Sequence, residues 1–197
     1  ASENNVVVQD YRPAVVYLNG EFWGIQNIRE KVNEHFVKTH FDIEPDDLDM
    51  LAILPNSAEP ELIHGSTEDY TEIRQFMTNN DLSIDDNYQH AAQKYDVDNL
   101  IDYKIAQIFV MNYDWPGNNN KLFKSKSGDG KWKHVMYDSD FGFERWGANP
   151  FNIGSYETYN MLDHAIGESN VFNNPVWSTA VFTTLLENMN FRNKFIN

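Results

Sequence analysis

The segment from residue 111 to residue 143 constrains the fold more than any other part of the sequence. Pro116-Gly117 forces a tight loop directly after an apolar-periodic helix, and this loop holds Asp114 and the asparagines 118–120 on a bend. A β-hairpin follows at once, with one strand over 121–125, a turn over 127–130 and a return strand over 131–137. The return strand delivers Asp138-Ser139-Asp140 at its end.

The two aspartates at the end of this hairpin have the spacing of a cation site. Side chains at i and i+2 of an extended chain project to the same side, so Asp138 and Asp140 can both face one cation. Magnesium prefers such carboxylate oxygens together with substrate phosphates and waters.

The remaining sequence predicts one α+β domain over residues 1–197. Asn19-Gly20 favours a type I′ turn, which predicts a hairpin with a return strand over 22–31 and with Asn27, Arg29 and Lys31 on one face. The apolar run 50–54 predicts a strand. The chain begins without Met and ends on Phe191 and Phe195 at i, i+4 spacing, like an opening helix, so we expect a piece of a longer protein.

Apolar spacing and capping residues predict the helices. We expect one helix to begin at Glu34, a second to follow the capping box at 66–69, and a third to be capped by Asp96 or Asp98. The last of these should bury a stripe of apolar residues, namely Ile101, Ile105, Ile108 and Phe109. Asn174-Pro175 should open a further helix that buries Val176, Val181, Phe182, Leu185 and Leu186.

Composition excludes several kinds of protein. The chain has 15 Lys and Arg against 30 Asp and Glu, a net charge of −15, which disfavours a sequence-independent nucleic-acid binder. It has no cysteine, so thiolate chemistry and cysteine-bound metals are excluded, and its six histidines lack zinc-ligand spacing. No stretch approaches the length of a membrane helix, and we expect a soluble domain without a transmembrane segment.

Charge is unevenly distributed along the chain. Residues 42–72 hold ten acids and no Lys or Arg, which we interpret as the solvated flanks of a strand. Residues 116–135 hold five lysines and one aspartate, a local charge of +4 that a triphosphate would need near its carboxylates.

The order of these features is that of protein-kinase catalysis. A helix, an Asp, an Asn five residues later, a hairpin and then a carboxylate loop occur in that order, with Asp114 and Asn119 at the kinase spacing and with Asp140-Phe141-Gly142 as the metal tripeptide. No His-Arg precedes Asp114 and no G-x-G-x-x-G loop occurs, so a typical eukaryotic-type kinase is ruled out.

Three segments in this order resemble the CotH kinase family, the spore coat protein H-like atypical kinases. They are 17–31 (YLNGEFWGIQNIREK), 112–119 (NYDWPGNN), and Lys131-Trp132-Lys133 leading into Asp138-Ser139-Asp140. The particular residues of these motifs resemble those of family members in envelope or secreted proteins of Bacteroides-like bacteria. The resemblance covers most of the chain.

The resemblance implies an atypical kinase-like fold that binds ATP and Mg²⁺ and phosphorylates Ser/Thr of protein substrates, often basic and Ser-rich ones. It implies roles for single residues: Asp114 catalytic, Asp138 the main metal ligand with Asp140 second, Asn118 or Asn119 assisting at the metal, and Arg29, Glu30 and Lys31 on the strand that faces the nucleotide. Lys121, the first lysine of the hairpin, is a further candidate for nucleotide binding. The location it implies is the cell envelope or the exterior.

Other interpretations stay open. Asp114 could only cap the Pro-Gly turn, and the asparagines 118–120 could only form that turn. Asp138 and Asp140 could lie in a solvated loop, and the lysine hairpin could be an exposed sheet edge that its charges protect from pairing. Trp115 and Trp146 flank the acidic loops and could line a base or sugar pocket. The alternative function is a non-catalytic envelope module that binds a glycan or a partner protein, with Ca²⁺ on its carboxylates. A third hypothesis is that the fragment lacks part of the nucleotide site.

Overall fold

A five-stranded sheet forms the centre of the molecule. The computed structural model describes residues 5–55, 57–143, 159–168 and 176–197. The strands lie in the order β1-β7-β6-β4-β5, where all pairs are antiparallel except β1 and β7. Their bounds are β1 Val7–Val8, β4 Leu48–Ile53, β5 Glu61–His64, β6 Asn120–Ser125 and β7 Lys133–Met136.

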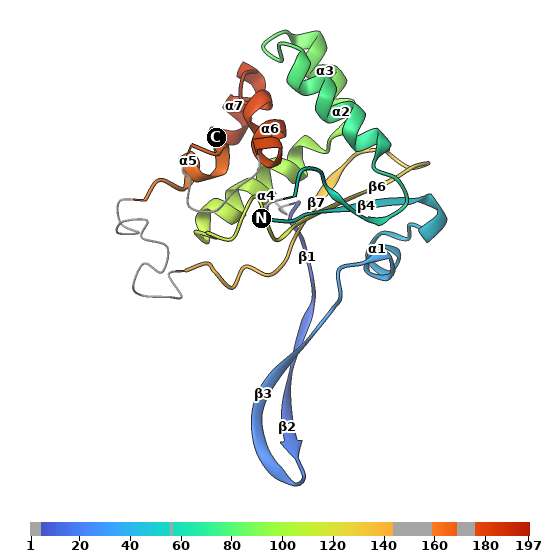
Figure 1. The fold of residues 1–197 in the computed structure, drawn as a ribbon, viewed down its shortest axis with the longest axis vertical. Coiled ribbons are helices and arrows are strands. Elements are labelled where there is room, and N and C mark those ends of the chain that lie inside the picture. The colour runs from blue at the N-terminus through green and yellow to red at the C-terminus, as the bar shows by residue number, and fades with distance from the viewer. Residues whose placement is uncertain (1–4, 56, 144–158, 169–175) are drawn as a thin grey trace.

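Helices cover both faces of this sheet (Figure 1). Helix α1 (Glu34–Phe41), followed by a short 3₁₀ turn over Pro45–Asp47, lies on one face. The other described helices lie on the opposite side, and they are α2 Glu68–Asn79, α3 Asp85–Lys94, α4 Val97–Phe109, α5 Met161–Ile166, α6 Val176–Leu185 and α7 Met189–Ile196. The α+β class is therefore confirmed, although the parallel pairing of β1 with β7 was not predicted.

Two cores result from the alternation of side chains along buried strands. In β4, Leu48 and Met50 pack with α1, whereas Leu51 and Ile53 pack with the larger helical layer. All six residues of β4 are buried, as expected for a strand covered on both faces.

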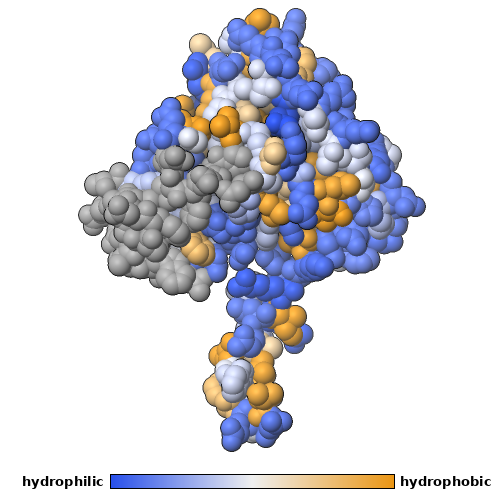
Figure 2. Space-filling view, viewed as in Figure 1, coloured by the Kyte–Doolittle hydropathy of each residue, from blue (hydrophilic) through white to orange (hydrophobic). Residues whose placement is uncertain are grey.

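Strands β2 (Tyr11–Leu18) and β3 (Glu21–Arg29) form a hairpin that projects from the body (Figure 1). Asn19 and Gly20 have φ values of 50° and 87°, so the predicted turn with two positive φ angles is confirmed. Much of the hairpin surface is apolar (Figure 2), including Trp23 and Ile25, which are 65% and 67% exposed. The root of this hairpin, rather than its tip, borders the candidate site described below.

The predicted buried face of α4 is partly wrong. Asp96 caps the helix as expected, and Ile101 is buried, but Ile105 and Phe109 are 43% and 76% exposed. The helix instead buries Lys104 and Gln107, because Lys104 lies against two aromatic rings and Gln107 binds a buried asparagine of the following loop. Apolar periodicity does not reveal such polar partners.

The predicted buried face of α6 also needs a correction. Val181, Phe182 and Leu185 are buried, but Val176 is 86% exposed at the beginning of the helix. The expected cap Asn174-Pro175 lies outside the described residues.

Two interpretations of the charged segments are overturned. The lysine hairpin is no free edge, because β6 lies between β7 and β4. The acids of 42–72 are not all solvated, because Asp49 is buried within β4 and accepts a hydrogen bond from the Ser66 backbone at 2.8 Å. Asp47 accepts bonds from the Ser125 and Ser127 hydroxyls at 2.5 and 2.8 Å, so these acids hold the hairpin that follows β6.

Candidate active site

The loop after α4 positions Asp114. Asn112 is fully buried, and its side-chain amide donates to Gln107 Oε1 at 2.9 Å while its own oxygen accepts from the Asp114 backbone at 3.1 Å. This asparagine therefore connects the end of α4 to the backbone of Asp114.

Two asparagine side chains fix the carboxylate of Asp114. Asn118 Nδ2 donates to both oxygens, at 3.0 and 2.9 Å, and Asn119 Nδ2 donates to Oδ2 at 2.9 Å. Three hydrogen bonds from neutral amides hold the group in one orientation without adding a competing charge. The asparagines of the bend thus contact Asp114 directly, which is more than a turn requires.

Trp115 anchors the same loop to the hydrophobic core. It is completely buried, its indole Nε1 donates to Tyr103 OH at 2.8 Å, and its backbone oxygen contacts His164 Nε2 in α5. The expectation that Trp115 lines an open pocket is therefore wrong, since the side chain fills the core. Trp146 lies outside the described residues.

The Asp138–Asp140 segment begins two residues after β7 ends. Asn119 Nδ2 also reaches the Asp138 backbone oxygen at 3.4 Å, so one side chain joins the two acidic loops. Asp138 and Asp140 line an open pocket of about 540 Å³, which Asn27 and Arg29 of β3 line from the hairpin side. The predicted common face is confirmed for Asn27 and Arg29 by this shared pocket, whereas β3 ends at Arg29 and the predicted third member, Lys31, lies beyond the strand.

Tyr137 lies between the carboxylates and a lysine. Burial, and after it the negative charges of Asp138 and Asp114, together raise the pKa of Tyr137 to about 12. Lys121 Nζ lies 4.7 Å from the centroid of the Tyr137 ring and donates to the Val32 backbone oxygen at 3.0 Å. Lys121 of β6 is thus held at the root of the hairpin, next to the acidic loops.

The surroundings of Lys121 disfavour its positive charge. Its pKa is lowered by partial burial and, secondly, by the positive charge of Lys31. An anion bound between these two lysines would relieve that repulsion.

Three of the other four lysines of the hairpin are engaged by acids in the described structure. Lys124 pairs with Asp69 at 2.7 Å, Lys126 lies 3.7 Å from Asp49, and Lys133 contacts Asp129. The local charge of +4 therefore does not form a free cationic surface over these residues.

Glu30 lies apart from the rest of the predicted set. Its carboxylate accepts a bond from the Asp10 backbone at 2.9 Å and lies 2.9 Å from His40 Nε2. Among the candidate residues, the structure therefore brings together Asp114, Asn118, Asn119, Asp138, Asp140, Lys121 and Arg29, with Lys31 close to Lys121, and it turns Glu30 toward α1.

Sequence reasoning missed Tyr137 and the Val32 carbonyl. Tyr137 directly precedes the Asp-x-Asp pair, and this adjacency in the sequence could have marked it as a residue of the site. The contact with Val32 joins residues 89 apart in the sequence, and no local pattern shows it.

The fold is of the mixed α+β class, and the side chain of Asn119 joins its two acidic loops. The chain matches the family described as CotH kinase protein over residues 1–197, and it belongs to that family. A search of curated proteins found no match. In the part of the chain that the structure describes, no helix has the length and apolar character needed to span a membrane.

Proposed function

We propose that the domain transfers the γ-phosphoryl group of Mg·ATP to Ser/Thr hydroxyls of a protein substrate. The observation that carries this proposal is the hydrogen-bonded junction of the two acidic loops, in which Asn119 contacts both the Asp114 carboxylate and the Asp138 backbone. Kinase chemistry requires a base and a metal-binding carboxylate at one place, and this junction supplies both groups.

The donor set suits magnesium. Asp138 and Asp140 offer carboxylate oxygens to one pocket, and magnesium favours oxygen ligands completed by waters and phosphates. Asn118 and Asn119 direct their NH₂ groups at Asp114, which leaves their amide oxygens out of those bonds. We assign Asp138 as the main ligand, with Asp140 and one of these asparagines assisting. When bound, Mg²⁺ would neutralise charge on the phosphates.

The surroundings also suit phosphate groups. Arg29 lines the same pocket as the two aspartates, and its guanidinium can bind phosphate oxygens in pairs. Lys31 and Lys121 repel one another beside Tyr137, and a polyphosphate would offset that repulsion. We therefore assign these three residues to the nucleotide, whereas the position of Glu30 argues against a direct contact with it.

The residues of this chain would divide the reaction between them. Asp114 accepts the proton of the substrate hydroxyl while the hydroxyl oxygen forms a bond to the γ-phosphorus of ATP. The bond from that phosphorus to the β,γ-bridging oxygen breaks, and ADP leaves. Asn118 and Asn119 hold Asp114 in the orientation to accept this proton. Trp115, locked in the core, keeps the whole loop in place.

The net charge of −15 suits a basic protein substrate, and a Ser-rich one would supply the acceptor hydroxyls. An envelope or secreted location and the Bacteroides-type assignment remain predictions from the resemblance, and a single domain over 1–197 remains a prediction from the sequence.

Calorimetry with Mg·ATP tests the proposal directly. We expect wild-type protein to bind Mg·ATP, Asp138→Ala to lose binding, and Asp114→Asn to bind while losing transfer to a basic Ser-containing peptide. Asp86→Ala, an exposed carboxylate on α3, is the matched control and should behave as wild type.

Two results would count against the proposal. Absence of any heat with Mg·ATP, or unchanged labelling by Asp138→Ala, would contradict it. Stabilisation by Ca²⁺ without any response to ATP would instead select a non-catalytic envelope module that binds a glycan or a partner protein.

A further inference from the structure

A second group of metal-ligating side chains lies at the root of the projecting hairpin. Asp10 lies between β1 and β2, Glu30 directly follows β3, and His40 lies in the last turn of α1. One ligand atom from each residue lies within 4.8 Å of the other two. We propose that these three side chains bind a zinc-type divalent cation, separate from the candidate active site and independent of the proposed kinase activity.

The backbone holds the two carboxylates in place. Beyond the last strand pair, Tyr11 with Arg29, the Glu30 N–H donates to the Asp10 oxygen at 3.1 Å. The Asp10 N–H donates back to Glu30 Oε2 at 2.9 Å, and Gln9 Nε2 donates to the Glu30 backbone oxygen at 2.8 Å. Asp10 and Glu30 are therefore neighbours by the register of the hairpin, whether or not a cation is bound.

The imidazole is positioned by α1. His40 packs on Phe36 one turn earlier, with ring centroids 4.5 Å apart, and Phe36 is buried in the core beneath the sheet. This contact turns Nε2 toward Glu30, both of whose oxygens lie 2.9 Å from it. Zinc lies about 2.0–2.2 Å from nitrogen and oxygen ligands, so two tetrahedral ligands lie about 3.4 Å apart. Opening the ion pair by a few tenths of an ångström would admit the metal.

The electrostatics favour a cation at this position. Two carboxylates beside one imidazole carry excess negative charge that a dication would balance. An imidazole nitrogen with two carboxylates suits zinc better than magnesium.

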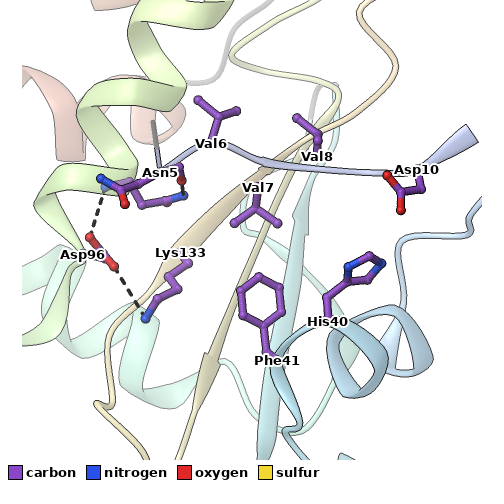
Figure 3. Close-up of a pocket in the computed structure, with 10 residues that line it drawn as sticks. Asn5, Val6, Val7, Val8, Asp10, His40, Phe41, Asp96 and Lys133 are labelled. Atoms are coloured by element: carbon purple, nitrogen blue, oxygen red, sulfur yellow. Dashed lines mark hydrogen bonds and ion pairs between the residues drawn. The ribbon is translucent and has the colours of Figure 1, made fainter. Parts of the chain in front are cut away.

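The site opens on a pocket. Asp10 and His40 lie at one end of a cavity of about 440 Å³, away from the Asp96 and Lys133 ion pair (Figure 3). Three protein ligands and one position open to water form the arrangement of accessible zinc sites, whereas structural sites are closed by four ligands. A metal here would join α1 to the root of the hairpin, whose Arg29 lines the candidate active site.

Titration of the chelator-treated chain with zinc chloride tests this site, by calorimetry at neutral pH. We expect the wild type to bind zinc and the variants His40→Gln, Glu30→Gln and Asp10→Asn each to lose affinity by about tenfold or more. Even the loss of a residue that only hydrogen-bonds a metal ligand has an effect of about this size. His35→Gln is the matched control, since this histidine lies on the same helix with a side chain that is 78% exposed. Asp138→Ala should retain the site, which separates it from any metal at the candidate active site.

Nuclear magnetic resonance gives a second readout. Zinc should shift the His40 Nε2 resonance and leave that of His35 unchanged, and circular dichroism should show that each variant is folded. The site does not exist if wild type fails to bind zinc, if His40→Gln and Asp10→Asn both bind as tightly as wild type, or if His35→Gln loses as much affinity as His40→Gln.

Discussion

The side-chain amide of Asn118 donates to both carboxylate oxygens of Asp114, at 3.0 and 2.9 Å. A single neutral donor that spans both oxygens fixes the plane of the carboxylate, and Asn119 adds a further bond to Oδ2. The first prediction follows from this contact, because the orientation of a general base matters to the rate more than to nucleotide affinity.

Asn118→Ala should lower kcat by about 10–100-fold while the affinity for Mg·ATP changes little. The substitution leaves the Asp114 carboxylate with one amide donor and freer to rotate. Steady-state kinetics with a Ser-containing peptide, together with calorimetry, measure the two effects separately. Asn193→Ala, an exposed asparagine on α7, is the control. A raised KM for ATP with an unchanged kcat would show that Asn118 serves the nucleotide instead.

The second prediction concerns Gly142, where the loop after Asp140 passes the end of α4. A Cβ atom at this position would lie 2.7 Å from the Val110 backbone oxygen and 3.1 Å from that of Ser139. Neither backbone atom can move alone, so Gly142→Ala should displace the segment that carries Asp138 and Asp140. We expect the affinity for Mg·ATP to fall about tenfold or more, because a misplaced carboxylate loses its geometry for the metal.

Gly130→Ala is the control for this substitution. An added Cβ there meets no atom of the described residues within 4 Å. Because Gly130 has a φ of 64°, the substitution should lower the free energy of unfolding without displacing a neighbour. Equal loss of nucleotide binding in the two variants would mean that the effect is general destabilisation rather than displacement of the acidic loop.

Local sequence signals predicted the parts of the fold that depend on a few adjacent residues. Asn19-Gly20 forms its turn and Asp96 caps α4, because each effect needs only the neighbouring backbone. The lysine hairpin and the loop with Asp114 were predicted for the same reason.

Contacts between distant segments account for what the sequence pattern did not predict. The buried Lys104 of α4 lies 4.4 Å from the Trp115 ring and 4.9 Å from that of Phe182, and only the tertiary packing brings these rings to it. Glu30, which the resemblance assigned to the nucleotide, instead has His40 of α1 as its partner, and no local pattern shows this contact between two elements. The roles of the active-site residues depend on ligands, and they stay predictions.

Lys104 provides the third prediction. It is 2% exposed, and burial lowers its pKa to about 7. The unfolded chain holds its proton up to the ordinary value of 10.5, so stability should rise as the pH increases from about 7 to about 10.5. Lys104→Met, which keeps the volume without the charge, should raise the free energy of unfolding by about 1–4 kcal/mol at pH near 6.

The gain from Lys104→Met should shrink at alkaline pH, where the lysine is neutral in the folded protein. Urea unfolding of wild type and variant across this pH range measures the difference. Lys131→Met, on the hairpin turn, should show no such dependence. A loss of stability at acid pH in Lys104→Met would mean that the ammonium contributes more through its aromatic contacts than its burial costs.

The fourth prediction concerns two buried histidines beneath the candidate active site. Burial lowers the pKa of His134 to about 3 and that of His164 to about 4, and in both the positive charge of Lys104 adds to the effect. In the unfolded chain each takes up a proton near the ordinary pKa of 6.5, whereas the folded protein does not. Stability is therefore present above this value and is lost as the pH falls toward 4, by about 1.4 kcal/mol per pH unit for each histidine.

His134→Phe isolates one of the two contributions. The ring of His134 stacks on Tyr103, with centroids 4.8 Å apart, and its Nε2 has no hydrogen-bond partner among the described residues, so an aromatic replacement keeps the packing. Loss of the bond to Asn120 lowers stability at every pH, and the slope with pH is the quantity to compare. Urea unfolding between about pH 4.5 and about pH 6 should give a slope smaller by about 1.4 kcal/mol per pH unit in this variant. The exposed His35→Gln should keep the wild-type slope, and an unchanged slope in His134→Phe would mean that His134 titrates alike in the folded and unfolded chains.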